Sequence, residues 1–451
     1  MKNSYAFLAA LASATVPAIA SATSATLLVS SGTTTETGQT YNASASDTSG
    51  VASTGGTVYL NGCTVSTTGS SSSTDNSSFY GLDSGVLAYT GGTIYMTGGS
   101  VTTSGTGANG IFAYGTGVGY VTDVTVTCKS NAGHAVMCSG GGTLTVNNLT
   151  ANTAGTNSGA IATDRGGGTI LVNGGTIETT GTDSPAIYST DTIDVANATL
   201  TATSSEAIVI EGLNNCTVTN CTISGGKDTY GAVMFVQTTS GDSSSGTGKM
   251  YMTNCAMTVT NGPAFFVTNN SAIIRVANST ITNSSTGVLL NAASTTRWGT
   301  TGKNGGTATF VAIADTLTGS LVADSISTIT ASLTNGTTYT GATTLAALTI
   351  DDASRWNVSG TSTLTSLTNE GTLCFQSPSY EATVSGTATL SGDLIVDFSS
   401  SAPTTGTYTL ISAGSISGTF SSFTVGTTLD SGYSAKITYS GTAVTLTVSK
   451  S

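Results

Sequence analysis

The stretch GGTILVNGGTIETTG, residues 167–181, decides the fold because its pattern recurs along the chain. Similar stretches begin at Gly55, Gly91 and Gly141. Each one contains two short apolar bursts with glycine or asparagine between them. Within a burst, polar and apolar residues alternate, as in Thr176-Ile177-Glu178, and alternation with period two predicts a β-strand.

Aligning the copies produces three columns of apolar residues, in which most steps are about 22 to 26 residues long. The first column is Val58, Ile94, Gly119, Leu144, Ile170, Ile193, Cys216, Met252 and Ile274. The second column is Val65, Val101, Val126, Ala151, Ile177, Leu200, Ile223, Val259 and Ile281. The third column is Leu87, Phe112, Val136, Ile161, Ile187, Ile208, Val233, Phe265 and Leu289.

Three columns indicate three short strands in each repeat. A single repeat cannot bury its apolar face, whereas stacked repeats place like residues over like residues. We therefore predict an all-β fold, a right-handed parallel β-helix with three strands per coil and a β-rich C-terminal cap. A β-propeller would require repeats of about 40 or more residues with four antiparallel strands each.

The chain divides into five predicted segments. Lys2, the apolar run from Ala6 to Ala20 and the small residues Ala20-Ser21-Ala22 are typical of a cleaved secretory signal. The segments are a signal peptide at 1–22, an N-terminal cap at 23–54, regular coils at 55–310, shorter and less regular coils at 311–379, and the C-terminal cap at 380–451. The product is expected to be secreted, either extracellular or associated with the cell surface.

The composition argues against a nucleic-acid partner and against a transmembrane segment. Charged residues make up 8% of the chain, and only 11 of its residues are Lys or Arg, with a net charge of −12. Scattered basic residues do not form the patch that nucleic-acid binding requires. Beyond the signal, no segment approaches the roughly 20 consecutive apolar residues of a membrane-spanning helix. We therefore expect neither a nucleic-acid partner nor a transmembrane segment.

Three insertions interrupt the repeats, at 70–81, 237–248 and 294–306. Insertions in solenoids fall in loops, which often carry binding function. The third insertion contains Arg297, Trp298 and Lys303, an unusual cluster for so uncharged a chain. We predict these three as binding residues, although a loop that packs its one aromatic ring against the coil would contain the same residues.

Two segments resemble a known kind of protein. SRWNVSGTSTLTSLTNEGTL, residues 354–373, followed by GTYTLISAGSISGTF, residues 406–420, resembles the C-terminal passenger region of autotransporter and adhesin-like secreted β-helix proteins, whose fold is that of the pectin lyases. The repeats from Gly91 onward are similar to secreted β-strand-repeat proteins of the same kind. The resemblance implies adhesion or a structural role at a surface and transfers no catalytic residues. Because no translocator barrel of outer-membrane strands follows, any surface attachment is expected to be noncovalent or through a partner.

Catalytic and metal-binding motifs do not emerge from the sequence. Hydrolases of polygalacturonate require aspartates on adjacent coils, whereas Asp351-Asp352 and Gly133-His134-Ala135 lie about 215 residues apart. His134, the only histidine, is predicted to be a surface residue. We therefore expect no enzymatic activity, no catalytic residues, no metal ligands and no cofactor.

The seven cysteines and the asparagines raise two questions of covalent modification. An odd count at irregular spacing argues against a disulfide framework, but a Cys128–Cys138 bridge stays open as an alternative. Candidate N-glycosylation sequons begin at Asn42, Asn76, Asn148, Asn197, Asn215, Asn220, Asn269, Asn278, Asn283, Asn335 and Asn357.

Threonine and serine flank the second column on its outward side, and Asn152 and Glu178 interrupt these rows. Stacked hydroxyls would form a flat, uncharged face similar to that of ice-binding β-helices. The favoured function is a non-catalytic, adhesin-like protein that binds glycans or partner surfaces through this repetitive polar face. Two alternatives stay open, a polysaccharide lyase or hydrolase and an ice-binding protein with a threonine ladder.

Overall fold

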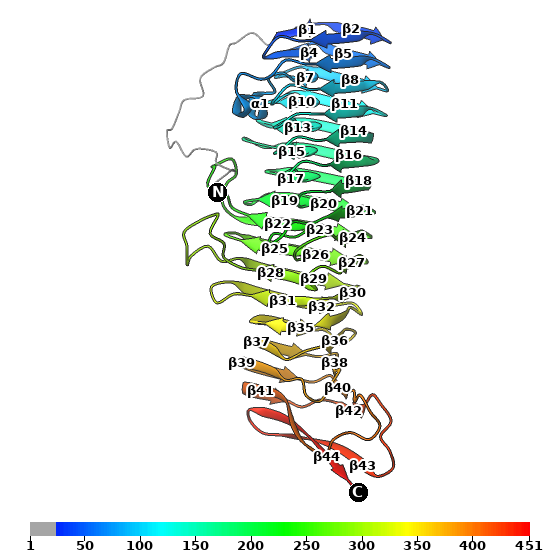
Figure 1. Cartoon of the computed structure of the whole chain (residues 1–451), viewed down its shortest axis with the longest axis vertical. Helices are drawn as coiled ribbons and strands as arrows, with labels where there is room; N and C mark the ends of the chain where they lie inside the picture. Colours follow the sequence, from blue (N-terminus) through cyan, green and yellow to red (C-terminus); the bar gives the residue numbers. More distant parts are fainter. Residues whose placement is uncertain (1–23) are drawn as a thin grey trace. The chain divides into compact units, whose positions relative to one another are not determined.

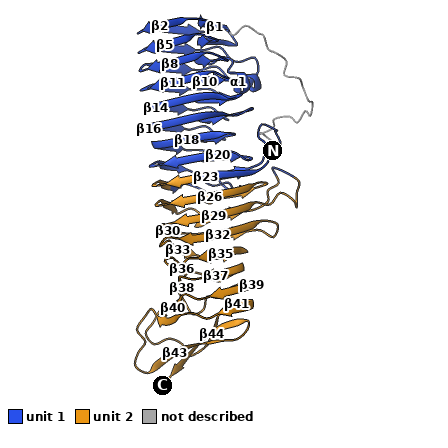
Figure 2. Ribbon diagram, turned by 180° about the vertical axis from the view of Figure 1, so that it is seen from behind, with its two compact units in different colours: residues 1–250, 258–262, 297–299 blue, residues 251–257, 263–296, 300–451 orange. Residues whose placement is uncertain are grey.

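The computed structural model describes residues 24–451 (Figure 1). The predicted signal peptide lies outside the described residues. The chain forms two compact units, coloured separately in Figure 2. Within the described range, the first unit contains residues up to 250 with 258–262 and 297–299, and the second contains 251–257, 263–296 and 300–451.

The first unit is a stack of parallel β-coils. One sheet follows the order β1 (Ser24–Val29), β4 (Thr48–Ser53), β7 (Val86–Ala88), β10 (Ile111–Tyr114), β13 (Val136–Ser139), β15 (Ile161–Thr163), β17 (Ile187–Ser189), β19 (Ile208–Glu211) and β22 (Val233–Val236). The other strands are β2 (Thr33–Thr37), β3 (Thr40–Ala43), β5 (Thr57–Asn61), β6 (Thr64–Thr67), β8 (Thr93–Thr97), β9 (Ser100–Thr103), β11 (Val118–Thr122), β12 (Thr125–Cys128), β14 (Gly142–Thr153), β16 (Gly168–Thr179), β18 (Thr192–Ala202), β20 (Asn215–Thr219) and β21 (Thr222–Gly225). Strands of neighbouring coils pair in parallel, as β14 does with β16 and β16 with β18, so the prediction of a parallel β-helix is confirmed.

Each coil contains the three predicted strand segments, two of which merge into one long strand in β14, β16 and β18. Pairing begins at the first described strand, because β1 pairs in parallel with β4, and β2 and β3 pair with β5 and β6. The segment predicted as an N-terminal cap thus contributes paired strands of its own.

The second unit holds a six-stranded sheet in the order β30 (Thr316–Thr318), β33 (Thr338–Gly341), β36 (Arg355–Val358), β38 (Thr372–Phe375), β40 (Asp393–Val396) and β42 (Ser422–Val425). The remaining strands that lie wholly in this unit are β25 (Phe265–Thr268), β26 (Ser271–Ala277), β27 (Thr280–Asn283), β28 (Val288–Ala292), β29 (Thr307–Ile313), β31 (Ser320–Ala323), β32 (Thr328–Thr334), β34 (Thr343–Thr344), β35 (Ala346–Ile350), β37 (Ser362–Asn369), β39 (Ala382–Leu390), β41 (Gly406–Gly418), β43 (Tyr433–Tyr439) and β44 (Ala443–Lys450). At its C-terminal end the pairing becomes antiparallel, where β44 pairs with β41 and β43. Strands β23 (Thr247–Thr253) and β24 (Ala256–Val259) contain residues of both units.

The predicted columns form the interior of the coils. In the second column, Val65, Val101 and Val126 occupy the same register, and Ala151, Ile177, Leu200 and Ile223 continue it. These side chains are fully buried. In the first column, Val58 to Cys216 are likewise in register.

The third column needs a correction at its first two members and at its last. Val86 and Ile111, rather than Leu87 and Phe112, align with Val136 and Ile161. Leu290, rather than Leu289, aligns with Phe265. The shift arises because these strands are apolar on both faces, so that alternation does not tell the inner face from the outer one. This second apolar face proves important for the site.

Asparagines stack at one corner of the coils. Asn148, Asn197 and Asn220 adopt left-handed backbone conformations, with φ of 52°, 56° and 53°. The Nδ2 of Asn197 donates to Oδ1 of Asn173 at 2.7 Å, and the Nδ2 of Asn220 donates to Oδ1 of Asn197 at 3.1 Å. Asparagine tolerates this conformation better than other side chains, so the corner itself accounts for the residue type.

Candidate functional site

The outer face of the sheet formed by β7, β10, β13 and β15 carries apolar residues. Ala52, Leu87, Phe112, Met137 and Ala162 form a buried cluster there. In the strand pairing, Ala162 aligns with Tyr188 on β17, and the row continues through Val209 on β19 and Met234 on β22. Strands of a parallel sheet are apolar on both faces where both faces are covered, so this row marks a covered surface.

A short helix formed by the first insertion covers part of this surface. Helix α1 (Thr74–Tyr80) begins at Ser73, whose side chain accepts from the backbone N–H of Asn76, and ends at Gly81 in a left-handed conformation. The hydroxyl of Ser139 on β13 donates to the carbonyl oxygen of Phe79 at 2.7 Å and holds the helix against the sheet.

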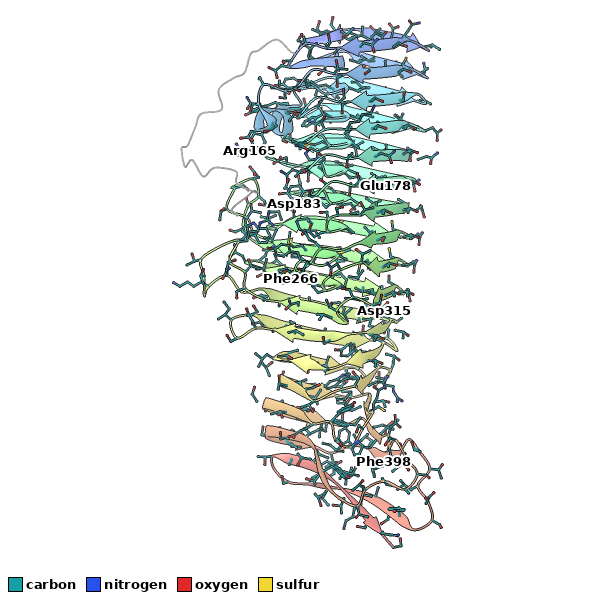
Figure 3. All side chains as sticks on the ribbon, viewed as in Figure 1. Arg165, Glu178, Asp183, Phe266, Asp315 and Phe398 are labelled. Carbon is teal, nitrogen blue, oxygen red and sulfur yellow. The ribbon has the colours of Figure 1, made fainter. Side chains whose placement is uncertain are left out.

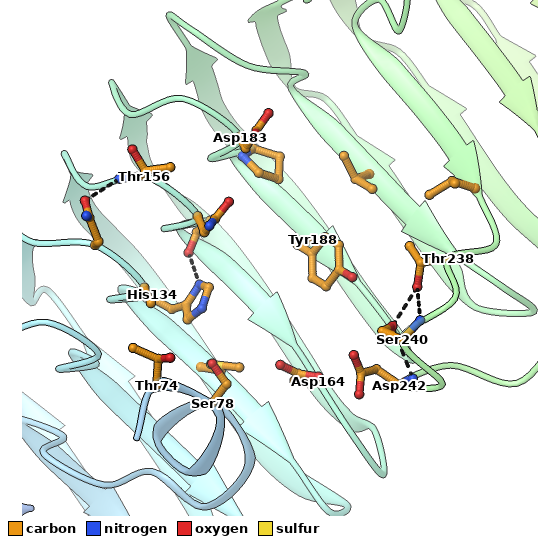
Figure 4. Close-up of a pocket in the computed structure, with 18 of the residues that line it drawn as sticks. Thr74, Ser78, His134, Thr156, Asp164, Asp183, Tyr188, Thr238, Ser240 and Asp242 are labelled. Carbon is orange, nitrogen blue, oxygen red and sulfur yellow. Dashed lines mark hydrogen bonds between the residues drawn. The ribbon is translucent and has the colours of Figure 1, made fainter. Parts of the chain in front are cut away.

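Beside the helix lies a cavity of about 300 Å³ (Figure 4). We call it the lateral cavity, and all of its lining residues belong to the first unit. Its apolar lining comes from the outward row and one insertion: Met137, Tyr188, Val209, Met234, Val236 and Trp298. Its titratable lining residues are His134, Asp164, Asp183, Tyr188 and Asp242.

Two carboxyl groups lie next to each other at one side of the cavity. Figure 4 shows Asp164, which follows β15, beside Asp242 of the second insertion. Arg165 pairs with Asp242, with Nη2 at 2.8 Å from Oδ1, and its guanidinium lies 3.9 Å from the centre of the Phe79 ring. Asp164 accepts from the backbone N–H of Arg165 at 2.7 Å. Burial, reinforced by the charge of Asp242, raises the pKa of Asp164 well above its usual range.

A hydrogen-bond network holds the adjoining wall. Glu211 at the end of β19 is fully buried and accepts from the hydroxyls of Tyr188 and Thr238. Burial raises the pKa of Glu211, and burial together with the Glu211 charge raises the pKa of Tyr188 well above its usual range. The network fixes the Tyr188 ring as part of the wall.

His134 lies in the cavity rather than on the surface, so the prediction of a surface histidine is wrong. Its side chain is nine-tenths buried, and its Nδ1 lies 2.8 Å from the carbonyl oxygen of Gly159. A carbonyl oxygen only accepts, so Nδ1 carries the proton and Nε2 is the acceptor. Burial lowers the pKa of His134 to about 4, and the ring is neutral near pH 7.

The predicted binding residues are only partly brought together. Trp298 is buried and lines the cavity, with its ring centre 5.3 Å from that of Tyr230. The Arg297 guanidinium lies 4.6 Å from the Trp298 ring centre. Lys303 is exposed, belongs to the second unit and does not line the cavity.

Asp183 lines the cavity and pairs with Lys227. Figure 3 shows Arg165 and Asp183 on the side of the first unit that carries α1, and Glu178 on the opposite side.

The threonine and serine rows beside Glu178 stack in register, with Thr64, Ser100 and Thr125 aligned. Asn152 pairs with Glu178 and interrupts the second row, as expected.

The structure bears on the bridge considered between two cysteines, and the glycosylation sequons stay a prediction. Cys128 and Cys138 are free, buried thiols, so the bridge considered between them is not formed. Each lies in the coil interior, where it fills space as a small apolar side chain. The sequon asparagines are all exposed or half-buried, and Asn148, Asn197, Asn220, Asn269, Asn278 and Asn335 have positive φ.

The chain matches no protein-family model, and no curated protein matches it. Within residues 24–451, no helix has the length and apolar character to cross a bilayer. In that same range, His, Cys, Asp and Glu side chains form no group of three or more that could hold a metal ion.

The sequence pattern missed Tyr188, Glu211 and Asp242 as site residues. A signal for the first two was present, because the strands around IYS and IVIE are apolar on consecutive positions where a coil strand should alternate. Asp242 gave no signal, because its insertion is otherwise serine, threonine and glycine.

Proposed function

We propose that this protein is exported and acts by binding glycans, with the lateral cavity as its specific site. The observation that carries the proposal is the combination of Trp298 and Tyr188 with carboxyl and imidazole groups around one cavity. Carbohydrate rings offer apolar faces and many hydroxyls, and such a lining supplies rings for the faces and acceptors for the hydroxyls. The cavity volume lies at the lower end of small-ligand sites.

The outer rows add a second, weaker mode of contact. Hydroxyl-bearing side chains such as Thr64, Ser100 and Thr125 repeat at the spacing of the strands. Many weak contacts at a matched spacing strengthen one another through multivalency. A protein with one specific cavity and one repetitive polar face is suited to adhesion at a surface, and this role is non-catalytic.

A glycan array probed with the full chain tests the proposal. We expect binding to a limited set of glycans, and Trp298→Ala is expected to weaken it at least tenfold. Tyr120→Ala is the matched control, because Tyr120 is 42% exposed and does not line the cavity. Absence of binding to every glycan, or equal losses in the two variants, would contradict the proposal.

One observation favours a second candidate, glycoside hydrolysis. Asp164 has a raised pKa and lies beside Asp242, which Arg165 pairs. Two neighbouring carboxyl groups, one of which has a raised pKa, resemble the pair of general acid and general base in glycosidases. Release of reducing ends from a bound glycan, abolished by Asp164→Asn but retained in Trp298→Phe, would favour this candidate over pure binding.

A further inference from the structure

We propose that the lateral cavity selects glycans that carry a protonated amine, such as oligosaccharides of glucosamine, over neutral or uronate-bearing glycans. The inference rests on the proposed function and narrows it to one chemical class. It follows from the balance of donors, acceptors and charges that face the cavity.

The first observation is an unused acceptor. His134 is nine-tenths buried, and its Nδ1 proton is committed to the Gly159 carbonyl. Its Nε2 receives no hydrogen bond from any of the described residues, although the ring lines the cavity and Figure 4 shows it facing the other lining residues. An acceptor that faces the cavity is open to a ligand that donates a hydrogen bond.

The second observation is an excess of carboxyl groups over cations. Asp164 and Asp242 lie side by side, and the one guanidinium beside them among the described residues, that of Arg165, pairs with Asp242. Within residues 24–451, the side-chain oxygens of Asp164 receive only a backbone N–H. Burial and the charge of Asp242 raise the pKa of Asp164 and drive it towards its neutral form in the free protein. An ammonium group placed against Asp164 would favour its ionised form and make a charge-assisted hydrogen bond at a half-buried position, where such a pair is stronger than in bulk water.

The other cations near the cavity are already engaged. Lys227 pairs with Asp183, and Arg297 lies against the Trp298 ring. A uronate would therefore bring a further carboxylate towards Asp164 and Asp242 without gaining a cation. Bringing like charges close together costs free energy, so binding of acidic glycans is disfavoured.

The aromatic wall supports the same choice. Trp298 and Tyr188 line the cavity together with Asp164. An aromatic face attracts a cation through its quadrupole, and the attraction grows when the cation is desolvated. A neutral acetamido group in place of the amine would lose both this attraction and the ion pair.

Calorimetric titration of the full chain with three tetrasaccharides tests the proposal: glucosamine, N-acetylglucosamine and galacturonate. We expect the glucosamine tetramer to bind at least tenfold more tightly than its acetylated counterpart, with no measurable binding of the galacturonate. Asp164→Asn is expected to remove the preference by weakening only the glucosamine tetramer. Glu178→Gln removes a carboxylate on the opposite side of the unit and serves as the matched control.

The outcomes separate this inference from the proposed function. Equal or tighter binding of the acetylated tetramer overturns the amine preference and leaves glycan binding standing. Binding of none of the three, together with an empty glycan array, overturns both. If Asp164→Asn lowers the melting temperature strongly, Asp242→Asn replaces it, and a preference that survives in a folded variant of either kind also overturns the inference.

Discussion

The Nδ1–H of His134 donates a hydrogen bond to the carbonyl oxygen of Gly159, with 2.8 Å between the nitrogen and the oxygen. These two residues belong to successive coils, and the backbone N–H of His134 also donates to Oδ1 of Asn109 at 3.0 Å. The histidine therefore connects three coils, and its tautomer is fixed by a group that can only accept. His134 therefore both links neighbouring coils through hydrogen bonds and presents an acceptor nitrogen to the cavity.

This link makes stability depend on pH. The pKa of His134 is about 4 in the folded chain and 6.5 without burial. The unfolded chain binds the proton first as the pH falls, so folded-state stability is complete above about pH 6.5 and declines towards pH 4. We expect protonation of His134 to lower the free energy of unfolding by about 2 to 3 kcal/mol. Denaturant unfolding of the wild type and of His134→Gln at several pH values isolates the effect. If the free energy of unfolding depends on pH in the same way in both proteins, the prediction is wrong.

The register of the coils predicts the effect of a buried charge. Ile187 is fully buried and aligned with Ile161 and Ile208 in the stacked interior. Ile187→Asp places an unpaired carboxylate there and should cost on the order of 3 kcal/mol or more. Leu171→Asp is the control, because Leu171 is 40% exposed on the same unit. Thermal melting should separate the two variants clearly, and similar melting temperatures would mean that the register is wrong.

The asparagine corner predicts a graded pair of variants. Asn197→Ala removes two amide hydrogen bonds, with Asn173 and Asn220, and leaves a side chain strained at φ of 56°. Asn197→Gly removes the same hydrogen bonds without that strain. We expect the free energy of unfolding to fall by about 2 kcal/mol in the alanine variant and by about 1 kcal/mol in the glycine variant. Equal stability of the two variants in urea titration would refute the role of the left-handed corner.

The two thiols considered for a bridge are expected to be unreactive in the folded chain. Burial raises the pKa of Cys128 to about 11 and that of Cys138 well above its usual range. Because the thiolate is the reactive form, iodoacetamide near pH 8 should leave both unmodified until denaturant is added. Peptide mass mapping before and after unfolding checks this, and rapid native modification of either thiol would show the prediction to be wrong.

The interior of the coils was readable from sequence because stacking repeats one local rule. Each coil places an apolar residue over its equivalent in the next coil, so Val65, Val101 and Val126 already form a column in the aligned repeats. Corner asparagines follow for the same reason, since every coil meets the same turn. Such features depend only on neighbours one repeat apart.

The lateral cavity could not be derived in this way. Helix α1, the loop that carries Asp242 and the residues around Trp298 come from insertions with no counterpart in other coils, and only tertiary packing sets them over one row of the sheet. That row was also misassigned at Leu87 and Phe112, because covering it made both faces of the strands apolar and removed the alternation that identifies the inside.

The parallel β-helix and most of its register could be predicted from the repeats alone, since periodic burial leaves a periodic pattern. The position of His134, the pairing of Arg165 with Asp242 and the wall formed by Tyr188 and Glu211 were decided by the tertiary structure, because a single site formed by unrepeated segments leaves no period to read.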